Sequence, residues 1–513
     1  MLTKLLRKLF GSRHEHDIDG SPEELVRQAE TLARAGRINT ALEYYRRCVQ
    51  AHPRAYSAYL GMANALVDLW AVDEAVAAYG KALELAPHSS AIFSAVLFHH
   101  HYLYDASGDD MFDRHRQYGR MMRDTVAPPD GSYALAPDPA RRLRIGYVSP
   151  NFSRHSVGYF VEPVIAHHDR ERYEIFCYYS HPRSDDVTAR MRALAARWRD
   201  VAAAHDDAVA QLIRSDGIDI LVDLAGHSKG NRLGVFARKP APIQMTWLGY
   251  PDTTGLATVD YRIADRVTDP APGADQRHTE RLLRIDDIFL CYRPPDDSPP
   301  VNERASAPSA VVFSSFNNIA KLNRQMICVW ATILARVPAS RIVLKSAALG
   351  YPDTVDRLAD FLEAHGIEPG RDELRGWIKD RRQHLELYAA VDVALDTFPY
   401  NGTTTTCEAL WMGVPVVSLA GSAHMSRVGA TVLRACGLSE LVAESPESYA
   451  DIAVALACDQ SRRAGMRANL RDRLRASPLF DHPGFTRKLE HMFRHSWEAW
   501  CAQQRVDRDA TGH

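Results

Sequence analysis

Residues 395–413 read LDTFPYNGTTTTCEALWMG, and this is the most informative stretch of the sequence. It predicts a buried strand, a tight turn at Gly402, four threonines at the start of a helix, and an acid, Glu408, one turn inside that helix. A helix N-terminus offers free N–H donors and a positive dipole end, so it suits a phosphate group. The alternative is an ordinary N-cap, because threonine is a common capping residue. Four hydroxyls in a row after Asn401 favour a site for a nucleotide diphosphate.

Strands and helices alternate on both sides of this stretch. Such alternation predicts parallel sheets with helices on both faces, here as two doubly wound, Rossmann-like α/β lobes with a cleft between them. We expect the first lobe over residues 141–295 and the second, with closing helices, over 308–505, joined by a Pro-, Asp- and Ser-rich linker at 293–308. The expected strands are 143–149, 173–179, 218–224, 310–316, 341–345, 393–395 and 414–419, and the expected helices between them are 207–214, 325–336, 355–365 and 383–390.

The N-terminal fifth of the chain contains a repeat with a period of 34 residues. This period and the pattern of small and aromatic residues are typical of a tetratricopeptide repeat. We expect an all-α repeat region over 21–125, with a third, decayed unit from about Ala91, followed by a proline-rich connection at 126–140. Two to three units are few for an independent solenoid, so the array should pack onto the α/β part of the chain. The recurring residues are Ala41, Tyr45, Cys48 and Pro53, then Ala75, Tyr79, Ala82 and Pro87.

The composition fits a globular protein of about three domains. Hydrophobic residues make up 46% of the 513, charged residues 25%, and the formal charge is −2, so nothing demands a nucleic-acid partner. The eight cysteines form no CxxC pair, which argues against zinc and disulfides and favours the cytoplasm. The sequence contains no run of 18 apolar residues, so we expect no membrane-spanning helix. The basic start, Met1–Phe10, is expected to belong to a flexible N-terminus, residues 1–20.

Two polar loops follow predicted strands and carry candidate catalytic residues. Lys321, in a loop of the second lobe, can neutralise a diphosphate leaving group. His155, in a loop of the first lobe, can face the acceptor and take a proton near neutral pH. For each, the alternative is an ordinary polar surface residue. Two further strand-end loops, 226–231 and 248–255, are expected to shape the sugar and acceptor side.

No Asp-x-Asp motif lies at a strand end. Asp17 and Asp19 lie in the N-terminal tail, and Asp507 and Asp509 lie at the far end of the chain. We therefore expect no metal and no cofactor, and the chemistry should depend on Lys321 and helix dipoles.

Taken together, the motifs resemble the O-GlcNAc transferase and SPINDLY family over about residues 21–500. The 34-residue repeats come first, and HSVGYF at 155–160, RKPAPIQ at 238–244, WLGYP at 247–251, FNNIAK at 316–321 and the Thr-rich turn follow in order. The resemblance implies a GT-B fold and an inverting, metal-independent transfer of a sugar from a nucleotide donor to Ser or Thr of proteins.

The resemblance also implies roles for single residues. His155 matches the active-site histidine, Lys321 the lysine on the diphosphate, and Asn318 a donor-contacting residue. His384 matches the histidine that stacks on the base and Arg381 a neighbouring lysine. Thr403, Thr404 and Thr405 match the phosphate turn, and Glu408 the acid that holds the ribose.

Two motif residues differ from those of the animal enzymes. The animal enzymes have Gln at the position that matches Asn318 and His at the position that matches Thr403. These versions are more similar to SPINDLY, whose donor is GDP-fucose, although many bacterial relatives share them. We predict UDP-GlcNAc as the donor and keep GDP-fucose as the alternative. Two rival functions are that of a GT-B enzyme acting on a small molecule or glycan and that of a repeat scaffold without activity. The repeats either recruit protein substrates or only brace the lobes.

Overall fold

The computed structural model describes residues 20–105, 108–127, 133, 135–301 and 310–511. The chain forms two compact units. The first-lobe unit contains residues 107–296, 422–439 and 471–513, and the second-lobe unit contains 1–106, 297–421 and 440–470. The basic segment Met1–Phe10, the Asp17–Asp19 pair and parts of both expected connections lie outside the described residues, and the side chains of Asp507 and Asp509 are not described.

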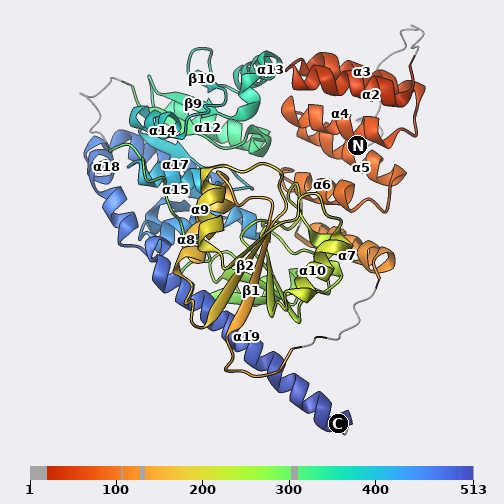
Figure 1. The fold of residues 1–513 in the computed structure, drawn as a ribbon. Helices are drawn as coiled ribbons and strands as arrows, with labels where there is room; N and C mark the ends of the chain where they lie inside the picture. Colours follow the sequence, from red (N-terminus) through yellow and green to blue (C-terminus); the bar gives the residue numbers. More distant parts are fainter. Residues whose placement is uncertain (1–19, 106–107, 128–132, 134, 302–309, 512–513) are drawn as a thin grey trace. The chain divides into compact units, whose positions relative to one another are not determined.

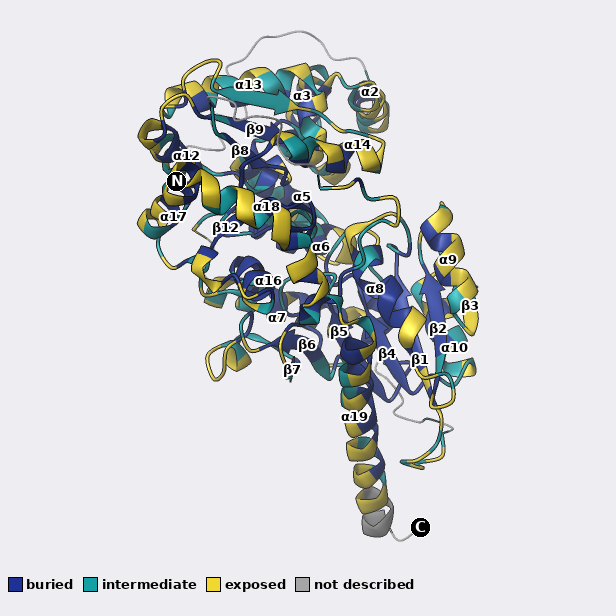
Figure 2. Ribbon diagram, turned by 90° about the vertical axis from the view of Figure 1, so that its left-hand side faces the viewer, coloured by how far each residue is buried: buried dark blue, intermediate teal, exposed yellow. Residues whose placement is uncertain are grey.

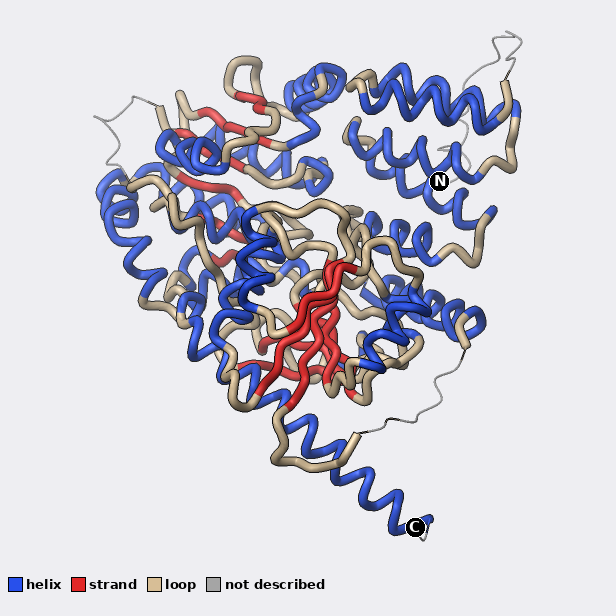
Figure 3. Tube along the Cα trace, viewed as in Figure 1, coloured by secondary structure: helices blue, strands red, loops and turns tan. Residues whose placement is uncertain are grey.

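The first-lobe unit is built on a seven-stranded sheet with the order β3-β2-β1-β4-β5-β6-β7, in which every pair is parallel. Figure 3 draws the strands in red. Its central strands are apolar and buried on both faces, as in other parallel sheets, and Figure 2 shows β1, β2 and β4 in dark blue. The strands are β1 (Leu143–Ser149), β2 (Tyr173–Tyr179), β3 (Arg197–Asp200), β4 (Ile220–Asp223), β5 (Ile243–Trp247), β6 (Tyr261–Asp265) and β7 (Arg281–Ile285).

The helices of this unit include α7, which lies within the region predicted to form the repeats, residues 21–125. Helix α7 packs its buried His115 and Tyr118 against strand-end loops of the first lobe, where the His115 imidazole Nε2 lies 2.9 Å from the Tyr250 hydroxyl. The helices are α7 (Gly108–Thr125), α8 (Ser156–His167), α9 (Asp186–Leu194), α10 (Asp206–Ser215), α11 (Leu233–Ala237), α16 (Val428–Ala435) and α19 (His482–Thr511).

The second-lobe unit contains a six-stranded sheet with the order β10-β9-β8-β11-β12-β13, again entirely parallel. The prediction of two doubly wound lobes is therefore confirmed. The strands are β8 (Val312–Ser315), β9 (Arg341–Lys345), β10 (Asp372–Arg375), β11 (Val393–Leu395), β12 (Val416–Leu419) and β13 (Val442–Ala443). The helices are α12 (Arg324–Arg336), α13 (Pro352–Ala364), α14 (Arg381–Glu386), α15 (Thr404–Trp411), α17 (Pro446–Cys458) and α18 (Gln460–Arg475). The last residues of α18 belong to the first-lobe unit.

Helical repeats complete the second-lobe unit. They are α2 (Pro22–Arg34), α3 (Ile38–Ala51), α4 (Tyr56–Asp68), α5 (Val72–Leu85) and α6 (Ser90–His100), drawn in red and orange in Figure 1. The residues that recur after 34 positions occupy matching places: Ala41, Tyr45 and Cys48 on α3 and Ala75, Tyr79 and Ala82 on α5 are all buried.

The repeats pack onto the second lobe, as the small number of units predicts. The Thr354 hydroxyl at the start of α13 donates to the Asp68 carbonyl (2.8 Å), and the Asn39 N–H donates to Asp353 Oδ2 (3.3 Å). Tyr351 packs against the repeat core. The array is thus braced by the lobe that contains the Thr-rich helix.

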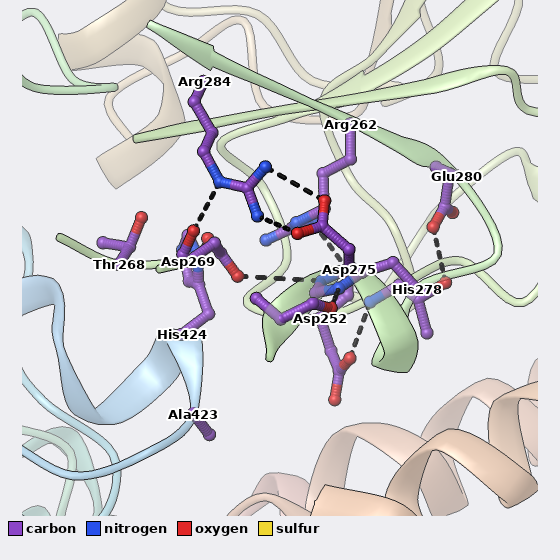
Figure 4. Close-up of polar contacts among 12 residues, drawn as sticks. Asp252, Arg262, Thr268, Asp269, Asp275, His278, Glu280, Arg284, Ala423 and His424 are labelled. Atoms are coloured by element: carbon purple, nitrogen blue, oxygen red, sulfur yellow. Dashed lines mark hydrogen bonds and ion pairs between the residues drawn. The ribbon is translucent and has the colours of Figure 1, made fainter. Parts of the chain in front are cut away.

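Two segments after β12 belong to the first-lobe unit, and the prediction that they belong to the second lobe is wrong. Residues 422–439 are anchored by His424, whose Nδ1 lies 2.6 Å from Asp269 Oδ2, and Arg284 Nε donates to the Asp269 carbonyl (2.6 Å) (Figure 4). Burial alone would raise the pKa of Asp269, but the charge and hydrogen bond of His424 hold it well below its usual range. Helix α19 is fixed by Trp497, whose indole N–H donates to the Asp138 carbonyl (2.9 Å).

Among the described residues, none of the helices combines the length and the apolar character that crossing a lipid bilayer would require.

Candidate active site

The loops predicted to bind the donor lie at the switch point of the second sheet. Neighbouring strands β8 and β11 divide the sheet, because β9 and β10 follow on one side and β12 and β13 on the other. Ligands of doubly wound sheets bind at such a point, beyond the carboxyl ends of the strands. Lys321, which follows β8, and Asn401, which follows β11, meet there: Lys321 Nζ donates to the Asn401 carbonyl (2.8 Å).

The Thr-rich helix α15 begins without a side-chain cap. Thr403 occupies the N-cap position but forms no capping hydrogen bond, so the ordinary-cap alternative is not what the structure contains. The Thr404 hydroxyl is buried and has no hydrogen-bond partner among the described residues. Thr405 donates to Asn317 Oδ1 (3.2 Å), and Thr406 donates to the Gly402 carbonyl (3.0 Å). The first two threonines and the first N–H groups of the helix therefore remain available to an anion.

The turn that leads into α15 is held by Asp396, a residue that the sequence analysis did not single out. Its Oδ1 accepts the N–H groups of Thr397 (2.9 Å) and Gly402 (2.6 Å), and its Oδ2 accepts the Ser418 hydroxyl (2.7 Å). Burial raises the pKa of Asp396 to about 6. A Cβ on Gly402 would lie 2.3 Å from Thr405 Oγ1, so only glycine fits here.

Lys321 is held at the end of a short 3-10 turn, Ile319–Lys321. Its Nζ also lies 3.4 Å from Asn317 Oδ1 and 4.2 Å from the centroid of the Tyr400 ring. Burial lowers the pKa of Lys321 to about 8, although the charge of Asp396 opposes this shift. The ammonium group is thus pre-positioned beside the start of α15, and its desolvation strengthens any interaction with an anion.

Glu408, expected to hold the ribose, engages two of the other predicted residues. Its Oε1 accepts Arg381 (3.2 Å), and its Oε2 lies 3.0 Å from His384 Nε2. Burial alone raises the pKa of Glu408, but the hydrogen bond from His384 and the charges of His384, Arg381 and Lys345 lower it overall. His384 Nδ1 is buried and has no hydrogen-bond partner among the described residues. The three side chains form one connected group.

Asn318 lies at the edge of this region and is exposed. Its Oδ1 accepts the Ala320 N–H (3.1 Å). Its side chain also favours the ionised form of Tyr102 from the repeats, although burial raises the pKa of that tyrosine overall. All the predicted binding residues of the second lobe are therefore carried on the carboxyl side of its sheet.

In the first-lobe unit, His155 follows β1 and caps helix α8. Its Nδ1 accepts the Val157 N–H (3.2 Å), so the neutral ring carries its proton on Nε2. The side chain reaches solvent, yet desolvation by the surrounding protein lowers its pKa to about 4. A Cβ on Gly158 would lie 2.2 Å from the Ser153 carbonyl oxygen, so glycine allows the loop to close onto the helix.

The loop after β4 is organised like the turn after β11. Asp223 accepts the N–H groups of Ala225 (3.0 Å) and Gly226 (2.8 Å) and the Thr246 hydroxyl (2.8 Å), and burial raises its pKa to about 6. Each lobe thus places a buried aspartate at the end of its fourth strand. The signal in the sequence is an aspartate directly after an apolar strand and shortly before a glycine.

Comparison with known proteins identifies relatives over most of the chain. A SPINDLY protein of Petunia hybrida, named "Probable UDP-N-acetylglucosamine--peptide N-acetylglucosaminyltransferase SPINDLY", is 41% identical over 78% of this chain and 43% of that protein. The SEC protein of Arabidopsis thaliana, with the same enzyme name, is 31% identical over 71% of this chain and 38% of that one. This chain therefore spans less than half the length of these two relatives.

A solved structure agrees with the sequence relatives. A mutant of the Thermobaculum terrenum O-GlcNAc transferase is 39% identical, with a TM-score of 0.88, and the match covers 94% of this chain and 92% of that one. The two doubly wound lobes and these relatives define a glycosyltransferase with the GT-B fold. Residues 92–292 and 302–489 match glycosyl transferase family 41, and the chain belongs to this family. The resemblance to O-GlcNAc transferases and SPINDLY is confirmed.

Proposed function

We propose that this chain transfers a sugar from a nucleotide diphosphate donor to Ser or Thr hydroxyls of proteins. The observation that carries the proposal is the pairing of Lys321 with an uncapped, Thr-rich helix start at the switch point of the second sheet. Two sources of positive potential at one point suit a diphosphate that gains charge as it leaves. The names of the relatives support a protein acceptor.

The reaction is a single displacement with inversion. The acceptor hydroxyl oxygen attacks the anomeric carbon from the face opposite the diphosphate, the bond to the diphosphate oxygen breaks, and the hydroxyl proton passes to a base or to water. Lys321, Thr403, Thr404 and Thr405 hold the diphosphate. Glu408 accepts ribose hydroxyls, His384 lies against the base with Arg381 and Asn318 nearby, and His155 faces the acceptor.

The proposal is tested by incubating the protein with a panel of nucleotide sugars, alone and with acceptor proteins, and analysing the products by mass spectrometry. Donor hydrolysis together with a sugar on Ser or Thr supports it. Transfer to a small molecule or glycan alone would favour a small-molecule or glycan transferase, and no turnover of any donor would favour a scaffold. The anomeric configuration of the product, read by NMR, reports inversion or retention.

UDP-GlcNAc is our proposed donor, because the names of the SPINDLY and SEC relatives both contain it. Titration calorimetry with UDP and GDP should give micromolar binding of UDP and weaker binding of GDP. Neither His384 nor Glu408 distinguishes uracil from guanine by itself, so the two nucleotides must be compared directly. Tight GDP binding without detectable UDP binding would replace the donor with GDP-fucose.

We also propose that transfer requires no metal, because Lys321 and the start of α15 supply the positive charge. Transfer rates should be unchanged, within about twofold, after removal of divalent ions with EDTA, since no step depends on a Lewis acid. A large loss in EDTA that added Mg²⁺ or Mn²⁺ restores would contradict this prediction.

A further inference from the structure

Aromatic side chains connect the helical repeats with the turn that carries Lys321, and all of them lie in the second-lobe unit. Trp70, at the end of α4, donates its indole N–H to the Leu322 carbonyl (3.0 Å). Leu322 directly follows Lys321 in the chain, so this bond fixes one end of the 3-10 turn. Trp70 itself is held by an edge-on contact with Phe361 of α13, with ring centroids 4.9 Å apart.

Tyr400 contacts both Lys321 and the repeats. The Lys321 ammonium lies 4.2 Å from the centroid of the Tyr400 ring, within the range of a cation–π interaction. Tyr400 also stacks with Tyr102, after α6, with ring centroids 5.6 Å apart and an interplanar angle of 28°. Tyr102 is only 7% exposed, and the Asn318 side chain acts on its hydroxyl by lowering a pKa that burial raises. Through Tyr102, the repeats therefore influence two proposed donor-binding residues, Asn318 directly and Lys321 by way of Tyr400.

The apolar contacts follow the same route. Val72 and Val76 of α5 form one buried cluster with Tyr102 and with Ala320, the residue before Lys321. A turn of three residues has too few internal hydrogen bonds to fix its own position. Its conformation must depend on the side chains that pack against it, and much of that packing comes from the repeats. Deleting residues 1–90 would remove Trp70 and expose Ala320, so such a truncation cannot test protein recruitment alone.

We propose that Trp70, Tyr102 and Tyr400 are positioning residues for Lys321, through which the helical repeats act on the diphosphate site. This inference rests on the proposed function for its catalytic meaning, although the contacts exist without it. The repeats then form part of the donor-binding machinery, besides any role in recruiting protein substrates. Sugar transfer and donor hydrolysis should respond together when these contacts are changed.

The pH at which the Lys321 amine titrates depends on the charged and aromatic groups around it. Asp396 and Tyr400 of the second lobe act on the ammonium directly. The Tyr400 ring in turn contacts Tyr102 and His101 of the repeats, and the His101 ring lies edge-on to it at 6.4 Å. Removing the Tyr400 ring takes away an interaction that favours the charged amine. The titration of Lys321 should then move to lower pH.

The experiment follows Lys321 directly. The full chain is reductively methylated with ¹³C, the Lys321 signal is assigned with Lys321→Met, and its titration is followed by NMR in wild type, Tyr400→Phe and Tyr400→Leu. We expect Tyr400→Leu to lower the midpoint by about 0.5–1 pH unit. Tyr400→Phe keeps the ring face and should stay near the wild-type value. This readout does not require activity, so it separates failure of the inference from failure of the proposed function.

Donor hydrolysis without acceptor gives the second readout. Tyr400→Leu and Trp70→Phe, which keeps the aromatic packing but lacks the N–H donor, should lower kcat about 3–30-fold. Tyr56→Ala on α4 changes a repeat side chain that is 48% exposed and should keep the wild-type rate. Folded Tyr400→Leu with an unshifted midpoint, or both variants with wild-type kcat, would overturn the positioning role.

Discussion

Lys321→Ala is expected to lower sugar transfer by about 10²–10³-fold, because a preorganised charge at the leaving diphosphate is a large part of catalysis in such sites. The fold should survive, since burial already disfavours the charged ammonium. The rate is measured with saturating donor and acceptor, and folding by circular dichroism. Lys321→Met, which fills a similar volume without charge, should lose as much activity as Lys321→Ala.

The pH dependence of the wild type provides a control for this prediction. Lys321 is charged below its pKa of about 8, so kcat/KM for the donor should fall as the pH rises through about 8. Lys321→Met should lose this alkaline limb. Lys81→Ala, a change to an exposed lysine on α5, should keep both the rate and the limb. Wild-type turnover in folded Lys321→Met would remove Lys321 from the mechanism.

The alternation of elements made the two lobes predictable from the sequence. Strands β1, β2, β9 and β11 have the bounds that their apolar runs predict, because central strands of parallel sheets are buried on both faces. Strands β3, β7, β10 and β13, which lie at sheet edges, were missed, and so were the interior strands β5 and β6. Residues 197–200 read RWRD and 372–375 read DELR, and such exposed or half-buried edges lack the apolar signal.

The exchange of segments between the units was not predictable either. Residues 422–439 follow a strand of the second lobe, and only tertiary contacts such as the one between His424 and Asp269 assign them to the first-lobe unit. A polar histidine in a loop has many possible partners. The sequence alone does not select one that lies so far away in the chain.

The candidate site was predictable where polar or charged residues come shortly after a predicted strand. Lys321 and the Thr-rich turn were found by this rule, and the switch point of the sheet brings them together. The supporting residues were missed for a different reason. A single aspartate such as Asp396, or an aromatic residue such as Tyr102, shows its role only through its spatial neighbours.

Asp396→Ala is expected to weaken nucleotide binding by about 10–100-fold, because the loss of one buried acceptor leaves three donors unpaired in the turn before α15. The turn also presents the Asn401 carbonyl to Lys321, so its distortion moves both parts of the diphosphate site. Breaking such a buried network should also cost roughly 3–5 kcal/mol of folding free energy. Affinity is measured by calorimetry with the nucleoside diphosphate, and stability by urea unfolding.

Asp223→Ala is the matched control, because Asp223 holds the equivalent loop of the first lobe with two N–H groups and one hydroxyl. Both variants should lose similar stability, since both leave three buried donors unpaired. Only Asp396→Ala should lose affinity for the nucleotide, because the proposed diphosphate contacts all lie in the second lobe. Equal losses of affinity in the two variants would mean that general destabilisation explains the effect. Unchanged affinity in folded Asp396→Ala would show that the turn before α15 does not form the diphosphate site.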